Sequence, residues 1–96
     1  MKLFITKHAI QRLFERSISA EDLEYAINNG DIISEYPDDK PYPSVLVHCM
    51  VYNKPLHVVY SIDDNEQHEK NYFVITAYRP SIKEWDNNYM TRREIK

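Results

Sequence analysis

The spacing of the apolar residues changes at Gly30, which is the only glycine of this 96-residue chain. Before Gly30, apolar residues recur every three or four positions, as they do on one face of an amphipathic helix. After Gly30, apolar and polar residues alternate in short runs, which is typical of strands. The sequence therefore predicts two N-terminal helices followed by a sheet. The apolar helix positions are Ala9, Ile10, Leu13 and Phe14 in the first helix and Leu23, Ala26 and Ile27 in the second.

Polar residues mark where both helices begin and where the second one ends. Thr6 can cap a first helix of about ten residues. Ser19 with Asp22 resembles a capping box for the second helix. Gly30 stands where a helix commonly ends in a left-handed residue, so we expect the second helix to end there with Gly30 left-handed.

Four runs predict the strands of the sheet, over residues 31–36, 44–52, 56–62 and 71–79. A chain of this length has no room for a second domain. We therefore expect a single α+β domain over residues 1–96, in which the two helices pack on a largely antiparallel sheet of about four strands.

The second and third of these runs predict a β-hairpin. Asn53-Lys54 can form its two-residue link, although lysine is unusual where glycine is preferred. This register would place His57 beside Met50, on the same face as His48.

The formal net charge of −3 argues against tight binding of nucleic acid through an overall cationic surface. Any contact with RNA or DNA must therefore be local. The lone cysteine, Cys49, cannot form an internal disulfide, and we expect it to be an inert core thiol. No signal sequence and no apolar run of about 20 residues is evident, so we expect a cytoplasmic protein without membrane contact.

Three polar residues, His8, Arg12 and Arg16, follow one another at four-residue spacing in the first predicted helix. They fall within roughly 80° of the helix surface, so all three can point at one ligand. The helix dipole disfavours a protonated imidazole in the first turn, which favours the neutral His8 that a general base requires. The two arginines can hold a phosphate bidentately.

The same residues have a purely structural interpretation. The two arginines could be solvated and paired with Glu15, Asp22 or Glu24, with His8 packed on the sheet. Exposed ion pairs contribute roughly 0–1 kcal/mol, so stability does not require two arginines there. Both interpretations stay open at the level of sequence.

Further polar residues of the predicted strands could join a site. His57 lies between apolar strand residues, a setting more typical of a core or edge histidine than of a catalyst. Thr76 and Tyr78 share one face of their strand, and Arg79 points to the other. Thr76 and Tyr78 could hydrogen-bond a substrate phosphate or simply complete the core.

Metal and nucleotide motifs are not evident. His48 and His57 could be diagonal neighbours, but no third or fourth ligand is evident, and neither Cys-x-x-Cys nor His-Glu-x-x-His occurs. We therefore expect no metal and no cofactor.

The tail around Trp85 and Tyr89 mixes aromatic and basic residues and could fold back on the sheet or bind a partner.

Six short motifs lie along the chain as a recognisable set. They are His8-Ala9 with Arg12 and Glu15-Arg16, Ile18-Ser19 with Asp22, Gly30, Tyr36-Pro37, Pro55-Leu56-His57-Val58-Val59, and Ile75-Thr76-Ala77-Tyr78-Arg79-Pro80. Together they resemble domain-of-unknown-function family 4258, over nearly the whole chain. That family looks like a member of the group with the barnase, EndoU, colicin and RelE-like fold, whose members are largely metal-independent RNases and often toxins of bacterial toxin–antitoxin pairs.

The resemblance implies a metal-independent endoribonuclease of RelE/barnase-like fold, in which the RNA 2′-hydroxyl attacks the neighbouring phosphate. His8 would be the base, the two arginines the phosphate clamp, and His57 or Tyr78 the acid or a further phosphate contact. The site residues that this implies are His8, Arg12, His57 and Tyr78 for catalysis and Arg16, Thr76 and Arg79 for substrate binding.

The implied substrate is RNA, and the implied partner is an antitoxin or immunity protein that covers the helix strip. The rival interpretation is a non-catalytic module that uses the same strip to bind an acidic protein surface or a nucleic acid. A third, a binder of small phosphates or nucleotides, would need a deeper pocket than this small chain suggests.

Overall fold

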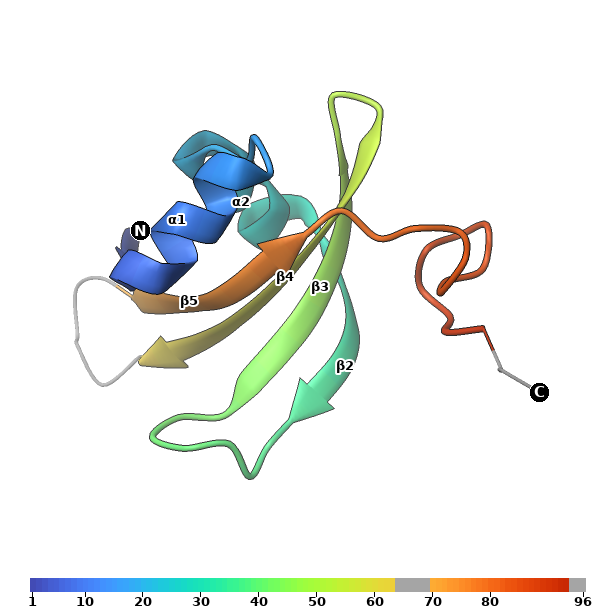
Figure 1. Cartoon of the computed structure of the whole chain (residues 1–96). Helices are drawn as coiled ribbons and strands as arrows, with labels where there is room; N and C mark the ends of the chain where they lie inside the picture. The colour runs from blue at the N-terminus through green and yellow to red at the C-terminus, as the bar shows by residue number, and fades with distance from the viewer. Residues whose placement is uncertain (64–69, 94–96) are drawn as a thin grey trace.

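A computed structural model describes residues 1–63 and 70–93 of the chain (Figure 1). Within these residues, two helices lie on one face of a five-stranded sheet, so the predicted α+β class is confirmed. The strand order across the sheet is β1-β5-β4-β3-β2. In chain order the elements are β1 (Lys2–Ile5), α1 (Lys7–Glu15), α2 (Ala20–Asn29), β2 (Asp31–Tyr36), β3 (Ser44–Val51), β4 (Lys54–Asp63) and β5 (Asn71–Tyr78).

β1 is an additional strand, since about four strands were predicted and the described residues form five. It pairs in parallel with β5, from Lys2 opposite Asn71 to Ile5 opposite Val74, whereas the other strand pairs are antiparallel. The sheet is therefore mixed. Four residues are too few to show a clear alternating pattern, and a parallel partner near the other end of the chain leaves no turn signal in the sequence.

The predicted caps start both helices. The Thr6 side chain accepts a hydrogen bond from the backbone N–H of Ala9 at 3.1 Å, next to the start of α1. Ser19 and Asp22 form both hydrogen bonds of a capping box, at 3.1 and 3.0 Å. These bonds satisfy donors that a helix N-terminus otherwise leaves unpaired. The helices run for 9 and 10 residues, and none in the described part of the chain is long and apolar enough to span a membrane.

Gly30 ends α2 as predicted, but its backbone is not left-handed. Its φ of −78° and ψ of 163° are extended, a conformation open to any L-residue. The need for glycine is steric instead. An added Cβ would lie 2.5 Å from the carbonyl oxygen of Ala26 and 2.9 Å from that of His48, so the passage from α2 to β2 leaves no room for a side chain.

The β3–β4 hairpin turns one residue earlier than predicted. Tyr52 and Asn53, with φ of 52° and 62°, form the two-residue turn, and β4 begins at the next residue. The register consequently places His57 opposite His48 rather than opposite Met50. The two histidines still share a face, because a shift of two residues preserves the alternation of side chains.

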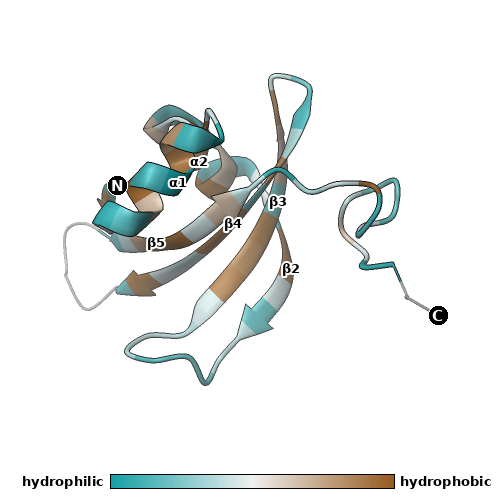
Figure 2. Ribbon diagram, viewed as in Figure 1, coloured by the Kyte–Doolittle hydropathy of each residue, from teal (hydrophilic) through white to brown (hydrophobic). Residues whose placement is uncertain are grey.

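The sheet has one face covered by helices and one open face. On the covered face, side chains of β3, β4 and β5 form the apolar core beneath α1 and α2, with Leu23, Leu56 and Val58 fully buried. Figure 2 shows apolar residues along these strands and polar residues on the outer side of the helices. The chain after β5 folds back against the open face, where Trp85 is buried.

Candidate functional site

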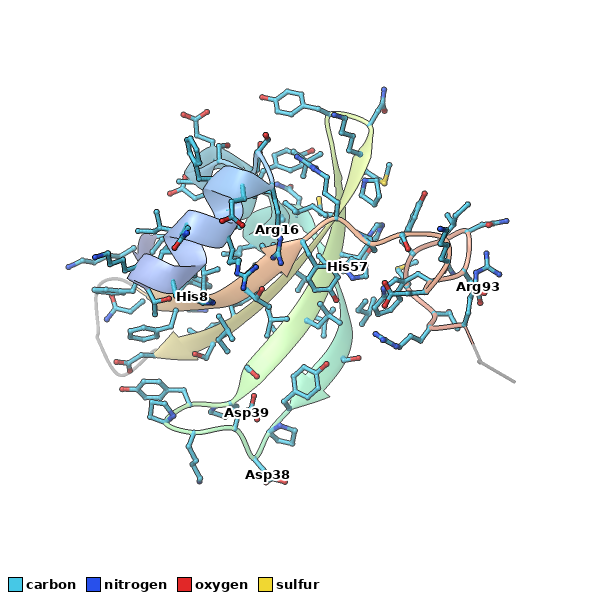
Figure 3. The ribbon with its side chains drawn as sticks, viewed as in Figure 1. His8, Arg16, Asp38, Asp39, His57 and Arg93 are labelled. Carbon is cyan, nitrogen blue, oxygen red and sulfur yellow. The ribbon has the colours of Figure 1, made fainter. Side chains whose placement is uncertain are left out.

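His8, Arg12 and Arg16, here called the helix strip, face the free edge of β5. β1 accompanies β5 only as far as Val74, and within the described residues no strand lies beside the rest of β5 on that side. Arg16 occupies part of this edge, since its Nη1 donates a hydrogen bond to the carbonyl oxygen of Ala77 at 2.7 Å. Figure 3 shows His8 and Arg16 between α1 and β5. The bond fixes the end of α1 against the end of β5.

A pocket of about 400 Å³ opens between α1 and this edge, and we call it the cationic pocket. Its polar lining is an imidazole, two guanidiniums and a hydroxyl, with no carboxylate among the described residues that line it. All four polar groups can donate hydrogen bonds to an anion, the imidazole from its N–H. In a chain of net charge −3, the pocket is a local cationic site. Its lining residues are His8, Ala9, Arg12, Arg16, Ile75, Thr76 and Ala77.

The arginines of the helix strip are not paired with acids in the described part of the chain. The observed ion pairs of arginine involve Arg92 and Arg93, near the C-terminus. Glu15 is within hydrogen-bonding distance of Gln11, and Asp22 serves the capping box. The described residues therefore give no support to the interpretation in which Arg12 and Arg16 form surface ion pairs. Both guanidiniums are available to a ligand.

His57 is fully buried on the open face, near the end of β5 (Figure 3). Its Nε2 lies 2.6 Å from the carbonyl oxygen of Tyr89, which can only accept a hydrogen bond, so Nε2 carries the proton. Its Nδ1, 3.3 Å from the Tyr78 hydroxyl, is left to accept from that hydroxyl. Burial lowers the pKa of His57 from 6.5 to about 4, and the neighbouring His48 acts in the same direction. His57 is therefore a neutral imidazole at pH 7.

The residues that cover His57 come from the segment after β5. The Trp85 ring meets the His57 ring edge-on, with centroids 4.5 Å apart. The Tyr89 ring stacks on the His48 ring at 6.1 Å, and His48 in turn meets His57 edge-on at 5.3 Å. The rings of Trp85, Tyr89 and His48 close one end of the open face and remove His57 from solvent.

Tyr78 directly follows the pocket residues Thr76 and Ala77 along β5, but it does not itself line the cationic pocket. Ala77 accepts the bond from Arg16, and Tyr78 shares the open face with Thr76 of the pocket lining. Burial raises the pKa of Tyr78, so its hydroxyl keeps its proton at neutral pH. Tyr78 is thus a donor, hydrogen-bonded to His57 at the strand end where Arg16 is anchored.

Arg79 lies apart from the pocket lining. Its Nη2 donates a hydrogen bond at 3.3 Å to the carbonyl oxygen of Ser17, in the turn between α1 and α2. Its Nη1 is buried without a hydrogen-bond partner in the described part of the chain. The structure thus separates the predicted site residues into three groups. These are His8, Arg12, Arg16 and Thr76 in the pocket, His57 and Tyr78 in the covered pair, and Arg79 at the helix turn.

One feature of the site was not predicted, and a second was one of two alternatives that the sequence left open. The pairing of β4 with β5 shifts register and leaves Ile75 as a bulged residue at the pocket wall. The rings of Trp85 and Tyr89 cover the histidines, and the only signal for this was the aromatic tail that could fold back. Both features depend on how strands and tail meet, which local sequence patterns do not encode.

His48 and His57 do not complete a metal site among the residues described, where no group of three or more His, Cys, Asp and Glu side chains could hold a metal ion. Cys49 is free and buried on the covered face. Its burial raises the pKa of the thiol, so it is a core thiol in this fold.

Comparisons with known proteins give one family. A search of curated proteins and a search of solved structures each found no match. The model of the family described as a domain of unknown function, DUF4258, matches residues 5–79. The match includes all of the cationic pocket and ends at Arg79, before the segment that covers His57. Because it extends over most of the chain, the protein belongs to the DUF4258 family.

Proposed function

We propose that this protein is a metal-independent endoribonuclease that acts at the cationic pocket. The observation that carries the proposal is the pocket itself, where the imidazole of His8 lies with two guanidiniums that have no acidic partner in the described chain. Cleavage through the 2′-hydroxyl needs a base, positive charge around the phosphorus and an acid, and side chains can supply all three.

In the proposed reaction, His8 takes the proton of the ribose 2′-hydroxyl, and the 2′-oxygen attacks the neighbouring phosphorus. The bond from phosphorus to the 5′-oxygen breaks, leaving a 2′,3′-cyclic phosphate on one product and a 5′-hydroxyl on the other. Arg12 and Arg16 neutralise the charge that develops on the non-bridging oxygens, and Thr76 donates a further hydrogen bond. The bond from Arg16 to Ala77 uses one of five N–H donors, so others remain for phosphate.

The departing 5′-oxygen must receive a proton, and we assign this role to Tyr78. Its raised pKa keeps the hydroxyl protonated, and Tyr78 is only partly buried. The proton that Tyr78 donates to His57 Nδ1 in this structure would turn to the 5′-oxygen when RNA is bound. His57 is less suited to the role, since it is fully buried and its own proton is donated to the carbonyl oxygen of Tyr89. In this proposal His57 holds the Tyr78 hydroxyl before the substrate binds and does not touch the substrate.

Cleavage of single-stranded RNA in EDTA, with analysis of the product ends, tests the proposal. We expect the wild type to leave 2′,3′-cyclic phosphates. His8→Ala should lose about 100-fold or more in rate while keeping its affinity for RNA, because it removes only the base. Arg12→Ala should lose both rate and affinity, because it removes charge that binds the phosphate.

Matched controls are Lys7→Ala and Lys54→Ala, which remove cations that do not line the pocket. Replacing the 2′-hydroxyl at a single position by hydrogen should stop cleavage there. Cleavage next to a 2′-deoxy position, or full activity of His8→Ala, would show that the assigned mechanism is wrong.

One observation favours a second candidate, a non-catalytic module that binds nucleic acid or an acidic protein. Of the four predicted catalytic residues, His57 is buried and Tyr78 is hydrogen-bonded to it. Among the described residues that line the pocket, His8 is then the only predicted base or acid. If neither wild type nor variant cleaves RNA, while binding depends on Arg12 and Arg16, this second function holds.

We further propose that the protein is the toxin of a toxin–antitoxin pair, restrained by an acidic partner over the cationic pocket. The charge of the pocket supports this, because carboxylates of a partner could pair with guanidiniums that lack acids in the described chain. Growth arrest on expression, lost in His8→Ala and relieved by one neighbouring gene product, is the expected result. Equal arrest by His8→Ala would contradict it.

A further inference from the structure

A second pocket, of about 450 Å³, lies beside the cationic pocket. Its walls come from β1, β5 and the loop before β3, and the aromatic rings of Phe4, Tyr42 and Phe73 form part of them. The Phe4 and Phe73 rings stack at 5.0 Å with 19° between their planes, and Tyr42 stacks on Phe73 at 5.7 Å with 15°. Three nearly parallel rings thus form an aromatic wall on the open face of the sheet.

The two pockets adjoin, because they share the wall residue Ile75 and because neighbouring residues of the chain line them. Ile75, the bulged residue of β5, lines both of them and is 50% exposed. Ile5 and Thr6 line the second pocket, and His8 lines the cationic pocket. The chain therefore passes from one pocket to the other where β1 ends and α1 begins. A ligand that fills both would pass over Ile75 at the free edge of β5.

Polar groups stand among the apolar walls of the second pocket. Asp39 and Lys40 line it from the loop before β3, and Ser61 lines it from β4. Ser61 is buried in the sheet, and its hydroxyl forms no side-chain hydrogen bond with another described residue. A flat ligand with hydrogen-bonding groups on its rim suits this combination of an aromatic wall and a few polar groups.

We propose that the second pocket binds a nucleobase of single-stranded RNA whose phosphate lies in the cationic pocket, an inference that rests on the proposed function. A nucleotide joins a flat, largely apolar ring with a polar edge to a phosphate. The second pocket offers a site for the ring, and the adjoining cationic pocket offers one for the phosphate. The RNA must be single-stranded, because paired and stacked bases do not present their faces to a protein pocket.

Binding of two oligomers tests this inference. One is a short 2′-O-methyl RNA, which cannot be cleaved through the 2′-hydroxyl, and the other is an abasic oligomer of the same length and charge. Fluorescence anisotropy should show that the wild type binds the RNA about tenfold or more tightly than the abasic oligomer, as contacts between bases and aromatic rings provide elsewhere.

Phe4→Ala and Tyr42→Ala should lose most of this tenfold preference and keep the affinity for the abasic oligomer. Tyr52→Ala is the matched control, because Tyr52 is 88% exposed in the β3–β4 turn, away from both pockets. Arg12→Ala should weaken binding of both oligomers. If an aromatic variant keeps its affinity for the abasic oligomer, that variant is folded. The comparison of the two oligomers' affinities for the wild type does not depend on any variant.

The outcomes separate this inference from the function on which it rests. If the wild type binds both oligomers equally, the base pocket is wrong, and the phosphate site stands. If Phe4→Ala and Tyr42→Ala both match Tyr52→Ala, the base is bound elsewhere, and this inference is overturned. If the wild type binds neither oligomer, both proposals are overturned together.

Discussion

Burial determines the protonation of His57. Nε2 donates to Tyr89 and Nδ1 accepts from Tyr78, and a second proton would place a charge among buried rings. The unfolded chain has no such penalty, and His57 there takes up a proton below about pH 6.5. The folded chain resists protonation until about pH 4, so acid favours unfolding between these values.

Urea unfolding at several pH values tests this linkage. The free energy of unfolding should fall as the pH drops from 6.5 to about 4, by on the order of 3 kcal/mol from His57, and this contribution should level off below about pH 4. His48, whose burial also lowers its pKa, adds a loss of the same sign. His57→Gln should remove the His57 part. Parallel pH profiles for His57→Gln and wild type would contradict this account.

Among the elements, the segment after β5 is held to the sheet by Trp85 and by Tyr89, whose carbonyl oxygen accepts from His57. Trp85 is 5% exposed and lies against His57, and the guanidinium of Arg92 lies over the same indole, 5.3 Å from the ring centroid. The exposed pair of Arg92 and Glu84, at 3.7 Å, adds little. The segment lies beyond the DUF4258 match and closes one end of the open face.

Trp85→Ala should release this segment. Loss of a buried indole typically lowers the free energy of unfolding by about 3 kcal/mol or more. We expect trypsin to cut after Lys83 much faster in Trp85→Ala than in wild type, while the matched domain stays folded. Ile82→Ala is the control, since Ile82 is 55% exposed. Equal cleavage rates in the two variants would mean that other contacts hold the segment.

At the scale of the whole molecule, a net charge of −3 coexists with a cationic pocket. The bulk charge opposes approach of RNA, so attraction must come from the few cations of the pocket. Few phosphates are then neutralised, and few counterions are released on binding. Binding of single-stranded RNA should therefore depend only weakly on salt, unlike that of a strongly basic protein.

The salt dependence gives a count of the phosphates that are bound. With one phosphate contact from each arginine of the helix strip, the logarithm of the affinity should fall with the logarithm of salt concentration with a slope of about −1.4. Arg12→Ala should reduce the slope by about 0.7 units, and Lys54→Ala should leave it unchanged. A slope several times steeper would place RNA on a larger surface than the cationic pocket.

Several features of the fold depend only on near neighbours in the chain and could be predicted. The caps at Thr6 and Ser19, the ends of α2 and the alternation of the strands follow from residues within about four positions, because helix and strand geometry is local. The helix strip could be predicted for the same reason, since its spacing alone aligns its side chains.

The contacts between these elements could not be predicted in this way, because they depend on how the whole chain packs. Three features join segments that are distant in the chain: the parallel pairing of β1, the close approach that requires Gly30, and the pocket that the helix strip shares with Thr76. The burial of His57 depends in the same way on Trp85 of a later segment. Desolvation and steric fit arise from all the atoms around a side chain. A local sequence pattern can therefore suggest which side chains could bind a ligand or transfer a proton. The packed fold determines which of them a ligand can reach.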